Sequence, residues 1–437
     1  MGEAPENGAL RQLFSFEPDV LVLSGAMFAF SLGFQMTSRF LPEYLTVLGA
    51  SAVVVGLYGT LGNLIAAVFP YYGGVISDRI GSRYALTLFG VLSTIGFGVW
   101  LVAAFIPVID LGPVSLEPWI WIFVGLILAQ AWKSFGLGAT FAVVRQSVRP
   151  DRLARGFAST ETVRRTAFLI GPLVVTVLVA DALMPGFLWV LGLAIGFGVL
   201  ATVVQHVLYD ASADTIGTEF QGLEQIRHDI EALPTTLRPL LIADTIVRFA
   251  NGMVYIFFIL VVTDLLEVGL TVPVPGLEPI DLSPTALFGV LLSLEMLVAL
   301  ISMGPTARAA ERVGLKPVVG LGFLVYAIFP VLFILAPPNA AVLLALFAFS
   351  GLRFAGLPGH KALIVGPADR DTGGRVTGTY YLIRNAVVIP SAALGGLLWA
   401  YVSPEVAFSI ASILGVIGVL YFARYGQEFD AYSSAPN

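Results

Sequence analysis

The chain alternates between long apolar blocks and short polar intervals over its whole length. Each apolar block is about 20 residues long, which is the length that a helix needs to cross the hydrocarbon core of a bilayer. Glycine, proline and charged residues separate the blocks and mark the helix ends. The pattern predicts an all-α membrane protein with twelve transmembrane helices, at residues 19–40, 52–76, 84–106, 119–144, 157–179, 186–209, 237–262, 284–303, 317–336, 340–363, 376–401 and 405–422.

A longer polar interval, residues 210–236, separates six predicted helices from the other six. It carries six acidic side chains and one arginine, as a solvated face does. We expect it to be a cytoplasmic linker, and binding of a partner is the alternative. The remaining segments are then an N-terminal segment at 1–18, two six-helix bundles at 19–209 and 237–422, and a tail at 423–437.

Basic side chains gather in every second connection between the predicted helices, as Arg79 and Arg83 do after the second helix. The connection after the seventh helix carries four acids instead. Because cytoplasmic loops are enriched in Lys and Arg, this distribution predicts that both termini lie in the cytoplasm. We therefore expect a multi-pass protein of the cell membrane.

The amino-acid composition excludes several classes of protein. Hydrophobic residues make up 57% of the chain and charged residues 12%, about half the charged share of a soluble domain. This balance excludes a soluble enzyme and a nucleic-acid binder. The chain has no cysteine, its three histidines lie far apart in the sequence, and it lacks a G-x-x-x-x-G-K-[ST] phosphate loop. We expect no metal, no organic cofactor and no enzymatic activity.

The two halves of the chain carry the same loop motif. Asp78-Arg79-Ile80-Gly81-Ser82-Arg83 follows the second predicted helix, and Glu311-Arg312-Val313-Gly314-Leu315-Lys316 follows the eighth. Both read acid-Arg-x-Gly-x-base. An internal repeat of this length indicates duplicated architecture. The twelve helices are therefore expected to form two pseudo-symmetric bundles.

The first copy belongs to a longer segment, residues 74–83, which resembles the loop signature G-x-L-A-D-R-x-G-R-K of the major facilitator superfamily of secondary transporters. Gly136-Leu137-Gly138-Ala139 is similar to the G-x-G-A segment of that family's fourth helix. The resemblance implies a monomer whose two bundles alternate the access of a central site. It also implies a latch at the cytoplasmic face, with simple positive-inside anchoring as the alternative. The latch residues are Gly74, Asp78, Arg79, Gly81, Arg83, Glu311 and Arg312.

Several cations lie within the predicted spans, where an ionisable side chain is costly and usually faces a cavity. Four of them recur at matched depths in the fourth and fifth helices of each half: Lys133, Arg165, Arg353 and Arg384. In the resembled family these helices line the cavity that holds the substrate near the midplane. Arginine suits carboxylate and phosphate groups. The expected substrate-binding residues are Lys133, Arg165, Arg248, Arg353 and Arg384.

Acids within the spans are fewer than cations. Glu161 precedes Arg165 by four residues and Asp244 precedes Arg248 by four, so each pair can meet on one helix face. Glu295 has no such neighbour and is the first candidate for a coupling proton. The expected proton-coupling residues are Glu295, Glu161 and Asp244, and structural salt bridges are the alternative.

Taken together, these features predict a secondary active transporter that moves a small solute by alternating access. An organic anion coupled to protons is the favoured cargo. Efflux of amphipathic drugs by proton antiport and a non-transporting membrane sensor are the alternatives. Arg39 and Glu43 are expected at a gate or an interface, and His360 is either an interfacial residue or a group that titrates near neutrality. The expected partners are the solute, protons and the lipid bilayer.

Overall fold

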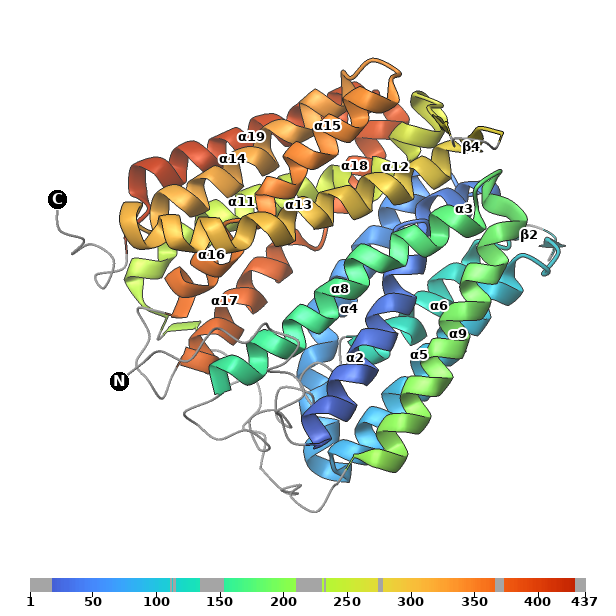
Figure 1. The fold of residues 1–437 in the computed structure, drawn as a ribbon, viewed down its shortest axis with the longest axis horizontal. Coiled ribbons are helices and arrows are strands. Elements are labelled where there is room, and N and C mark those ends of the chain that lie inside the picture. Colours follow the sequence, from blue (N-terminus) through green and yellow to red (C-terminus); the bar gives the residue numbers. More distant parts are fainter. Residues whose placement is uncertain are drawn as a thin grey trace. The chain divides into compact units, whose positions relative to one another are not determined.

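We describe the chain from a computed structural model, drawn as a ribbon in Figure 1. The structure describes residues 18–110, 112, 115–133, 153–209, 230–231, 233–273, 278–365 and 373–428. Each of the twelve predicted spans contains a helix within these residues, and the expected all-α membrane class is confirmed. Nine helices in the described part are long and apolar enough to cross a membrane. Most of the predicted linker, residues 210–229, lies outside the described residues.

Contacts divide the chain into two compact units, and the first consists of Met1–Arg39, Val68–Leu178 and Met184–Phe220. Two of its helices approach closely through a glycine: a Cβ atom added to Gly96 would lie 2.3 Å from the backbone nitrogen of Ala129. Small residues allow such an approach between helices in a bilayer. The helices wholly or partly in this unit are α2 (Pro18–Thr37), α4 (Ala52–Ile80), α5 (Ser82–Ala103), α6 (Ile120–Ala131), α8 (Leu153–Leu178) and α9 (Leu183–Leu208).

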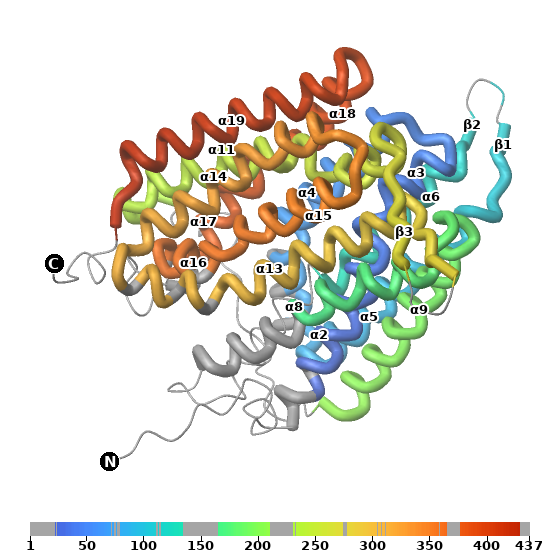
Figure 2. The backbone as a smooth tube through the Cα atoms, turned by 45° about the horizontal axis from the view of Figure 1, so that its top comes forward, coloured from blue at the N-terminus to red at the C-terminus, as the bar shows by residue number. Residues whose placement is uncertain are grey.

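The second unit consists of Phe40–Ala67, Val179–Leu183 and Gln221–Asn437. Its long helices α11, α14 and α19 run side by side, as Figure 2 shows, and bury one apolar cluster between them. Besides the first part of α4, the helices of this unit are α3 (Leu41–Val47), α11 (Arg238–Val254), α12 (Phe258–Leu260), α13 (Pro284–Val313), α14 (Leu315–Ile334), α15 (Ala340–Gly351), α16 (Leu357–Val365), α17 (Gly373–Val388), α18 (Ser391–Tyr401) and α19 (Pro404–Tyr425).

Three predicted spans of the second unit are interrupted. The span at 237–262 continues from α11 through a 3₁₀ turn, α12 and a π turn. The span at 340–363 is split by a 3₁₀ turn, Leu352–Phe354, between α15 and α16. The span at 376–401 is split before Pro390, between α17 and α18. Hydropathy reports only that a segment is apolar, so it does not locate these breaks. Irregular backbone at membrane depth is tolerated where protein or a cavity surrounds it.

Two short antiparallel hairpins interrupt the helical pattern and were not predicted from the sequence. The first pairs β1 (Ile109–Asp110) with β2 (Ser115–Leu116), in the connection from α5 to α6. The second pairs β3 (Leu270–Val272) with β4 (Ile280–Leu282), in the connection that leads into α13. Both hairpins lie in connections that the charge distribution assigns to the outer side of the membrane.

The duplicated loop motif has the same backbone conformation in both copies. Gly81, between α4 and α5, has φ 84° and ψ 152°. Gly314, between α13 and α14, has φ 89° and ψ 165°. A positive φ of this size is readily adopted only by glycine. The internal repeat that the two motifs predicted is thus visible in the backbone as well.

The segment Phe40–Ala67 belongs to the first half of the sequence but packs within the second unit. A Cβ atom added to Gly56 would lie 2.6 Å from the carbonyl oxygen of Ala392 on α18. The backbone N–H of Ala393 donates a hydrogen bond to the Thr60 hydroxyl at 2.9 Å. The repeated motifs divide the sequence into two halves, whereas the contacts divide the structure into two compact units. The boundaries of the halves and of the units differ at this segment. The domain boundaries drawn from the sequence stay a prediction.

Candidate functional site

Asp244 on α11 forms the centre of a buried polar cluster in the second unit. Its side chain is fully buried. The Oδ1 atom lies 3.2 Å from the Nε atom of Arg248, which is the pair that their four-residue spacing predicted. The Oδ2 atom accepts hydrogen bonds from Nη1 of Arg384 at 3.2 Å and from the Tyr380 hydroxyl at 3.1 Å, both on α17. One carboxylate therefore joins two helices that are far apart in the sequence.

His360 on α16 lies against the same carboxylate. Its Nε2 atom is 3.2 Å from Oδ2 of Asp244, although the contact lacks hydrogen-bond geometry. The histidine is 3% exposed, so it lies inside the bundle, and its expected place at the membrane interface stays a prediction. The alternative, that His360 titrates near neutrality, stays a prediction.

Arg353 and Glu295 form a second buried pair in the same unit. Nη2 of Arg353 lies 2.8 Å from Oε1 of Glu295, and both side chains are at most 4% exposed. The hydroxyl of Ser350 donates to the same carboxylate oxygen. The partner that Glu295 lacked on its own helix therefore comes from the 3₁₀ turn after α15. Four aromatic rings surround the guanidinium, with centroids 4.8–5.9 Å from Cζ, and stabilise it by cation–π attraction: Tyr255, Tyr326, Phe329 and Phe354.

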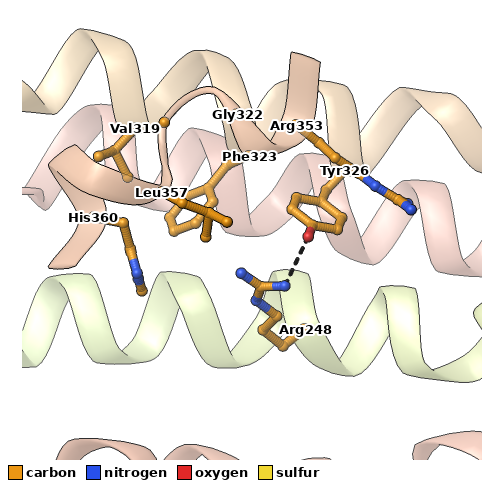
Figure 3. A pocket seen from close by; sticks show the side chains of 9 residues that line it. Arg248, Val319, Gly322, Phe323, Tyr326, Arg353, Leu357 and His360 are labelled. Atoms are coloured by element: carbon orange, nitrogen blue, oxygen red, sulfur yellow. Dashed lines mark hydrogen bonds between the residues drawn. The ribbon is translucent and has the colours of Figure 1, made fainter. Parts of the chain in front are cut away.

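A small pocket opens between α11, α14 and the region around α16, with about 220 Å³ of empty space including its mouth. Figure 3 shows Arg248 on one side of it and His360 on the other, while the Arg353 side chain extends past Tyr326 and away from Arg248. Nη1 of Arg248 donates to the Tyr326 hydroxyl at 2.8 Å. The pocket is lined by Arg248, Val319, Gly322, Phe323, Tyr326, Arg353, Gly356, Leu357 and His360.

The cationic and anionic groups of this region do not balance. Three guanidinium groups, of Arg248, Arg353 and Arg384, lie among two carboxylates, of Asp244 and Glu295. The described cluster around Asp244 and Glu295 thus holds one guanidinium group more than it holds carboxylates. Arg248 is 23% exposed, whereas Arg353 is 1% exposed, so Arg248 is the more accessible of the two pocket arginines.

The other predicted substrate-binding residues lie in the first unit. Lys133 is exposed, and its Nζ atom lies 5.7 Å from the ring centroid of Phe34. Arg165 is partly buried on α8. The side chain of Glu161 lies outside the described residues. The structure therefore brings together Arg248, Arg353, Arg384, Asp244 and Glu295 in one unit.

The predicted latch residues occupy the repeated loops. Nε of Arg83 donates to the carbonyl of Tyr209 at 3.0 Å, and Nη2 of Arg83 bonds the same oxygen. This contact ties the start of α5 to the residue after α9 within the first unit. Arg79 and Arg312 are exposed. The side chains of Asp78 and Glu311 lie outside the described residues, and the latch role stays a prediction.

Three polar residues of the site were absent from the predicted set. Tyr380 and Tyr326 supply hydroxyl groups to Asp244 and Arg248, and Ser350 supplies one to Glu295. One signal was available for Tyr380, which precedes Arg384 by four residues on the same helix and so shares its face. Tyrosine and serine are common in transmembrane helices, so their presence alone carried no signal.

The fold and the buried charges define a multi-pass helical membrane protein with duplicated halves. Residues 240–434 match the model of the Major Facilitator Superfamily. An uncharacterized MFS-type transporter of Methanocaldococcus jannaschii is 22% identical over 403 residues, which is 92% of this chain and 93% of the relative. The similarity to the major facilitator superfamily that the loop motif indicated is thus confirmed by a family model over the second half of the chain and by a relative over nearly all of it.

Solved transporters share the fold over almost the whole chain. The nucleoside transporter NupG, crystallised as a mutant, has a TM-score of 0.73 at 12% identity, over 93% of this chain and all of that one (100%). A mutant of the peptide transporter POT in complex with sulfate has a TM-score of 0.70 at 14% identity, covering 95% and 98%. At these identities the likeness establishes the fold alone.

Proposed function

We propose that this protein moves a small organic anion across the cell membrane by alternating access, coupled to protons, as a monomer with both termini in the cytoplasm. One observation supports an anion as the transported solute. The described cluster of the second unit holds three guanidinium groups against two carboxylates, and Arg248 reaches a pocket beside it.

A buried charge without a counter-charge costs several kcal/mol, so it persists only where function maintains it. An anionic solute that reaches Arg248 supplies the missing negative charge. The guanidinium presents several N–H groups in one plane, which suits a carboxylate or a phosphate. Two of the donors of Arg248 are already held by Asp244 and Tyr326, which fixes the orientation of the group toward the pocket.

The same contacts suggest how protons are coupled to the solute. Asp244 competes with an incoming anion for Arg248, and Glu295 does so for Arg353. A proton on either carboxylate removes its negative charge and releases the arginine for the solute. Binding of the anion and binding of a proton therefore favour each other, which is the reciprocal linkage that cotransport requires.

Counterflow in proteoliposomes tests the proposal. The purified full-length protein is loaded with unlabelled solute and exposed to labelled mono- and dicarboxylates, phosphate esters, a nucleoside, a dipeptide, a sugar and a cationic dye, at two pH values. The nucleoside and peptide arms are included because the structurally similar proteins are transporters of those compounds. We expect counterflow of one class of anion, faster at the lower pH.

Two other outcomes would overturn the anion assignment. Flux of the dye without flux of any anion would indicate efflux of amphipathic drugs. Ligand binding without flux of any compound would indicate a membrane sensor.

A further inference from the structure

Glu43 is a buried acid in a second part of the molecule. It lies on α3, beyond the predicted first span, in the Phe40–Ala67 segment that packs within the second unit. Its side chain is 9% exposed. The Oε1 atom accepts a hydrogen bond from the hydroxyl of Thr285 on α13. The Oε2 atom is buried and has no hydrogen-bond partner among the described residues.

The charged surroundings of Glu43 favour its neutral form. The charged group that acts on Glu43 from the packed elements is another acid, Asp264, in the π turn after α12. From α13, the neighbour is the neutral hydroxyl of Thr285. Arg39 precedes Glu43 by four residues and belongs to the first unit. Burial raises the pKa of Glu43 to about 7; the Thr285 hydrogen bond opposes this shift and the charge of Asp264 adds to it.

Several other contacts of the Phe40–Ala67 segment involve groups that do not titrate. The ring of Phe40 meets that of Phe288 edge-on, with centroids 5.9 Å apart. Gly56 lies against α18, and Thr60 accepts a hydrogen bond from a backbone N–H of α18. Among these contacts, Glu43 is the group through which a change of pH near neutrality acts on the interface.

We propose that Glu43 is a proton-binding site that controls a gate, formed where the Phe40–Ala67 segment packs against α13 and α18. The inference rests on the alternating access of the proposed function. With the gate closed, the carboxyl group is buried and carries a proton. Ionisation places a negative charge beside Thr285 with one oxygen unpaired, so the gate opens and water reaches the carboxylate.

The direction of the pH effect follows from proton linkage. The closed gate binds one more proton at Glu43 than the open gate does. A fall in pH therefore favours the closed gate and a rise in pH favours the open gate. A single group changes the open-to-closed ratio by at most about tenfold for each pH unit.

A distance measurement between two spin labels tests this directly and needs no transported solute. The chain has no cysteine, so Val47→Cys and Val402→Cys place labels at two exposed positions only, one on each side of the gate. The doubly labelled full-length protein is placed in lipid nanodiscs. Electron–electron resonance then gives the distance distribution from about pH 5 to about pH 9, a range that brackets a carboxyl group raised toward neutrality.

We expect the population of the longer distance to rise with pH. Glu43→Gln should hold the short distance at every pH, because glutamine keeps an acceptor for Thr285 and cannot ionise. Glu43→Asp should keep a pH dependence with a shifted midpoint. Glu267→Gln, the same chemical change at an exposed acid, is the matched control and should reproduce the parent curve. The short distance of Glu43→Gln at low pH also shows that the variant is folded.

Two results would overturn the assignment of Glu43. One is a distance distribution of the parent protein that does not change with pH, and the other is a parent-like pH dependence in Glu43→Gln. Neither result bears on the anion, which the counterflow panel tests separately. Conversely, a pH-dependent gate that Glu43→Gln abolishes would stand even if no anion in the panel were transported.

Discussion

Asp244 on α11 and Glu43 on α3 are both buried carboxyl groups of the second unit, but their partners differ in charge. Asp244 contacts two guanidinium groups, of Arg248 and Arg384, at 3.2 Å each. Within the part of the chain that the structure describes, Glu43 accepts one hydrogen bond, from the neutral hydroxyl of Thr285, and its Oε2 atom has no hydrogen-bond partner. Opposite charges favour the ionised form of an acid, whereas burial without them favours the neutral form.

The comparison separates two uses of a buried acid. At Asp244 the negative charge is required as long as no solute anion replaces it, because removing it leaves two cations without a counter-charge. At Glu43 the surroundings disfavour the negative charge. Gaining or losing a proton there therefore changes the stability of the interface. Variants that remove the charge without changing size can test this difference.

The largest effect is expected for Asp244→Asn. The substitution leaves Arg248 and Arg384, which are partly buried, without the fully buried carboxylate that they share, and removing one partner of a buried pair costs about 3–5 kcal/mol. Glu43→Gln, the equivalent change, should stay within about 1 kcal/mol of the parent protein, because the hydrogen bond with Thr285 is retained. Thermal unfolding of the purified variants in detergent measures both. Equal losses in the two variants would remove the distinction between the two acids.

A double-mutant cycle at Glu295 and Arg353 sharpens the comparison. Glu295→Gln strands a guanidinium whose side chain is 1% exposed, and Arg353→Met strands a carboxylate that is 4% exposed. The double variant leaves neither group unpaired. The loss of stability in the double variant should therefore be smaller, by about 1–3 kcal/mol, than the sum of the losses in the two single variants. Additive losses in thermal unfolding would mean that the pair is not coupled.

The fold was predictable from the sequence because the bilayer requires long apolar helices and excludes most other structures. The twelve spans and the repeated loop glycines, Gly81 and Gly314, followed from hydropathy and from one motif. The interruptions around Leu352–Phe354 and Pro390 did not, because they depend on packing against neighbouring helices. The chain also supplied no sign that Phe40–Ala67 would pack within the second unit.

The candidate site was predictable in its residue types and only partly in its contacts. Arg353 and Glu295 were identified because charge in an apolar stretch is costly. The Asp244–Arg248 pair followed from helix geometry, since the residues are four apart. The contact of Asp244 with Arg384 joins residues 140 positions apart, and only the three-dimensional packing of α11 against α17 determines it.

A transport measurement asks whether the excess arginine serves the solute. Arg248→Gln removes the charge nearest the pocket while leaving Arg384 as a counter-charge for Asp244. Loss of a charged hydrogen bond to a solute costs about 1.5–3 kcal/mol, so counterflow of the transported anion should fall by roughly tenfold to a hundredfold. Phe323→Leu, on the same pocket wall without a charge, serves as the control and should have a smaller effect. Unchanged anion flux in Arg248→Gln would assign the arginine to structure alone.

Smaller losses of stability than for Asp244→Asn are expected at the repeated glycines, of which each half of the chain has one. Alanine at Gly81 or Gly314 must adopt a positive φ, at a cost of about 1–2 kcal/mol. Gly314 has an additional neighbour: the carboxylate of Glu428 accepts hydrogen bonds from the N–H groups of Leu315 and Lys316, at 3.1 and 2.8 Å. A Cβ atom at Gly314 would lie 2.5 Å from that carboxylate.

The carboxylate must therefore move in Gly314→Ala, and its two hydrogen bonds at the start of α14 weaken. Thermal unfolding should show a larger loss for Gly314→Ala than for Gly81→Ala. In a Glu428→Gln background, where the negative charge at the helix N-terminus is already absent, the difference between the two alanine variants should shrink. If the alanine variants lose equal stability in both backgrounds, the Glu428 contact contributes nothing, and backbone conformation alone accounts for the glycine in each copy of the repeat.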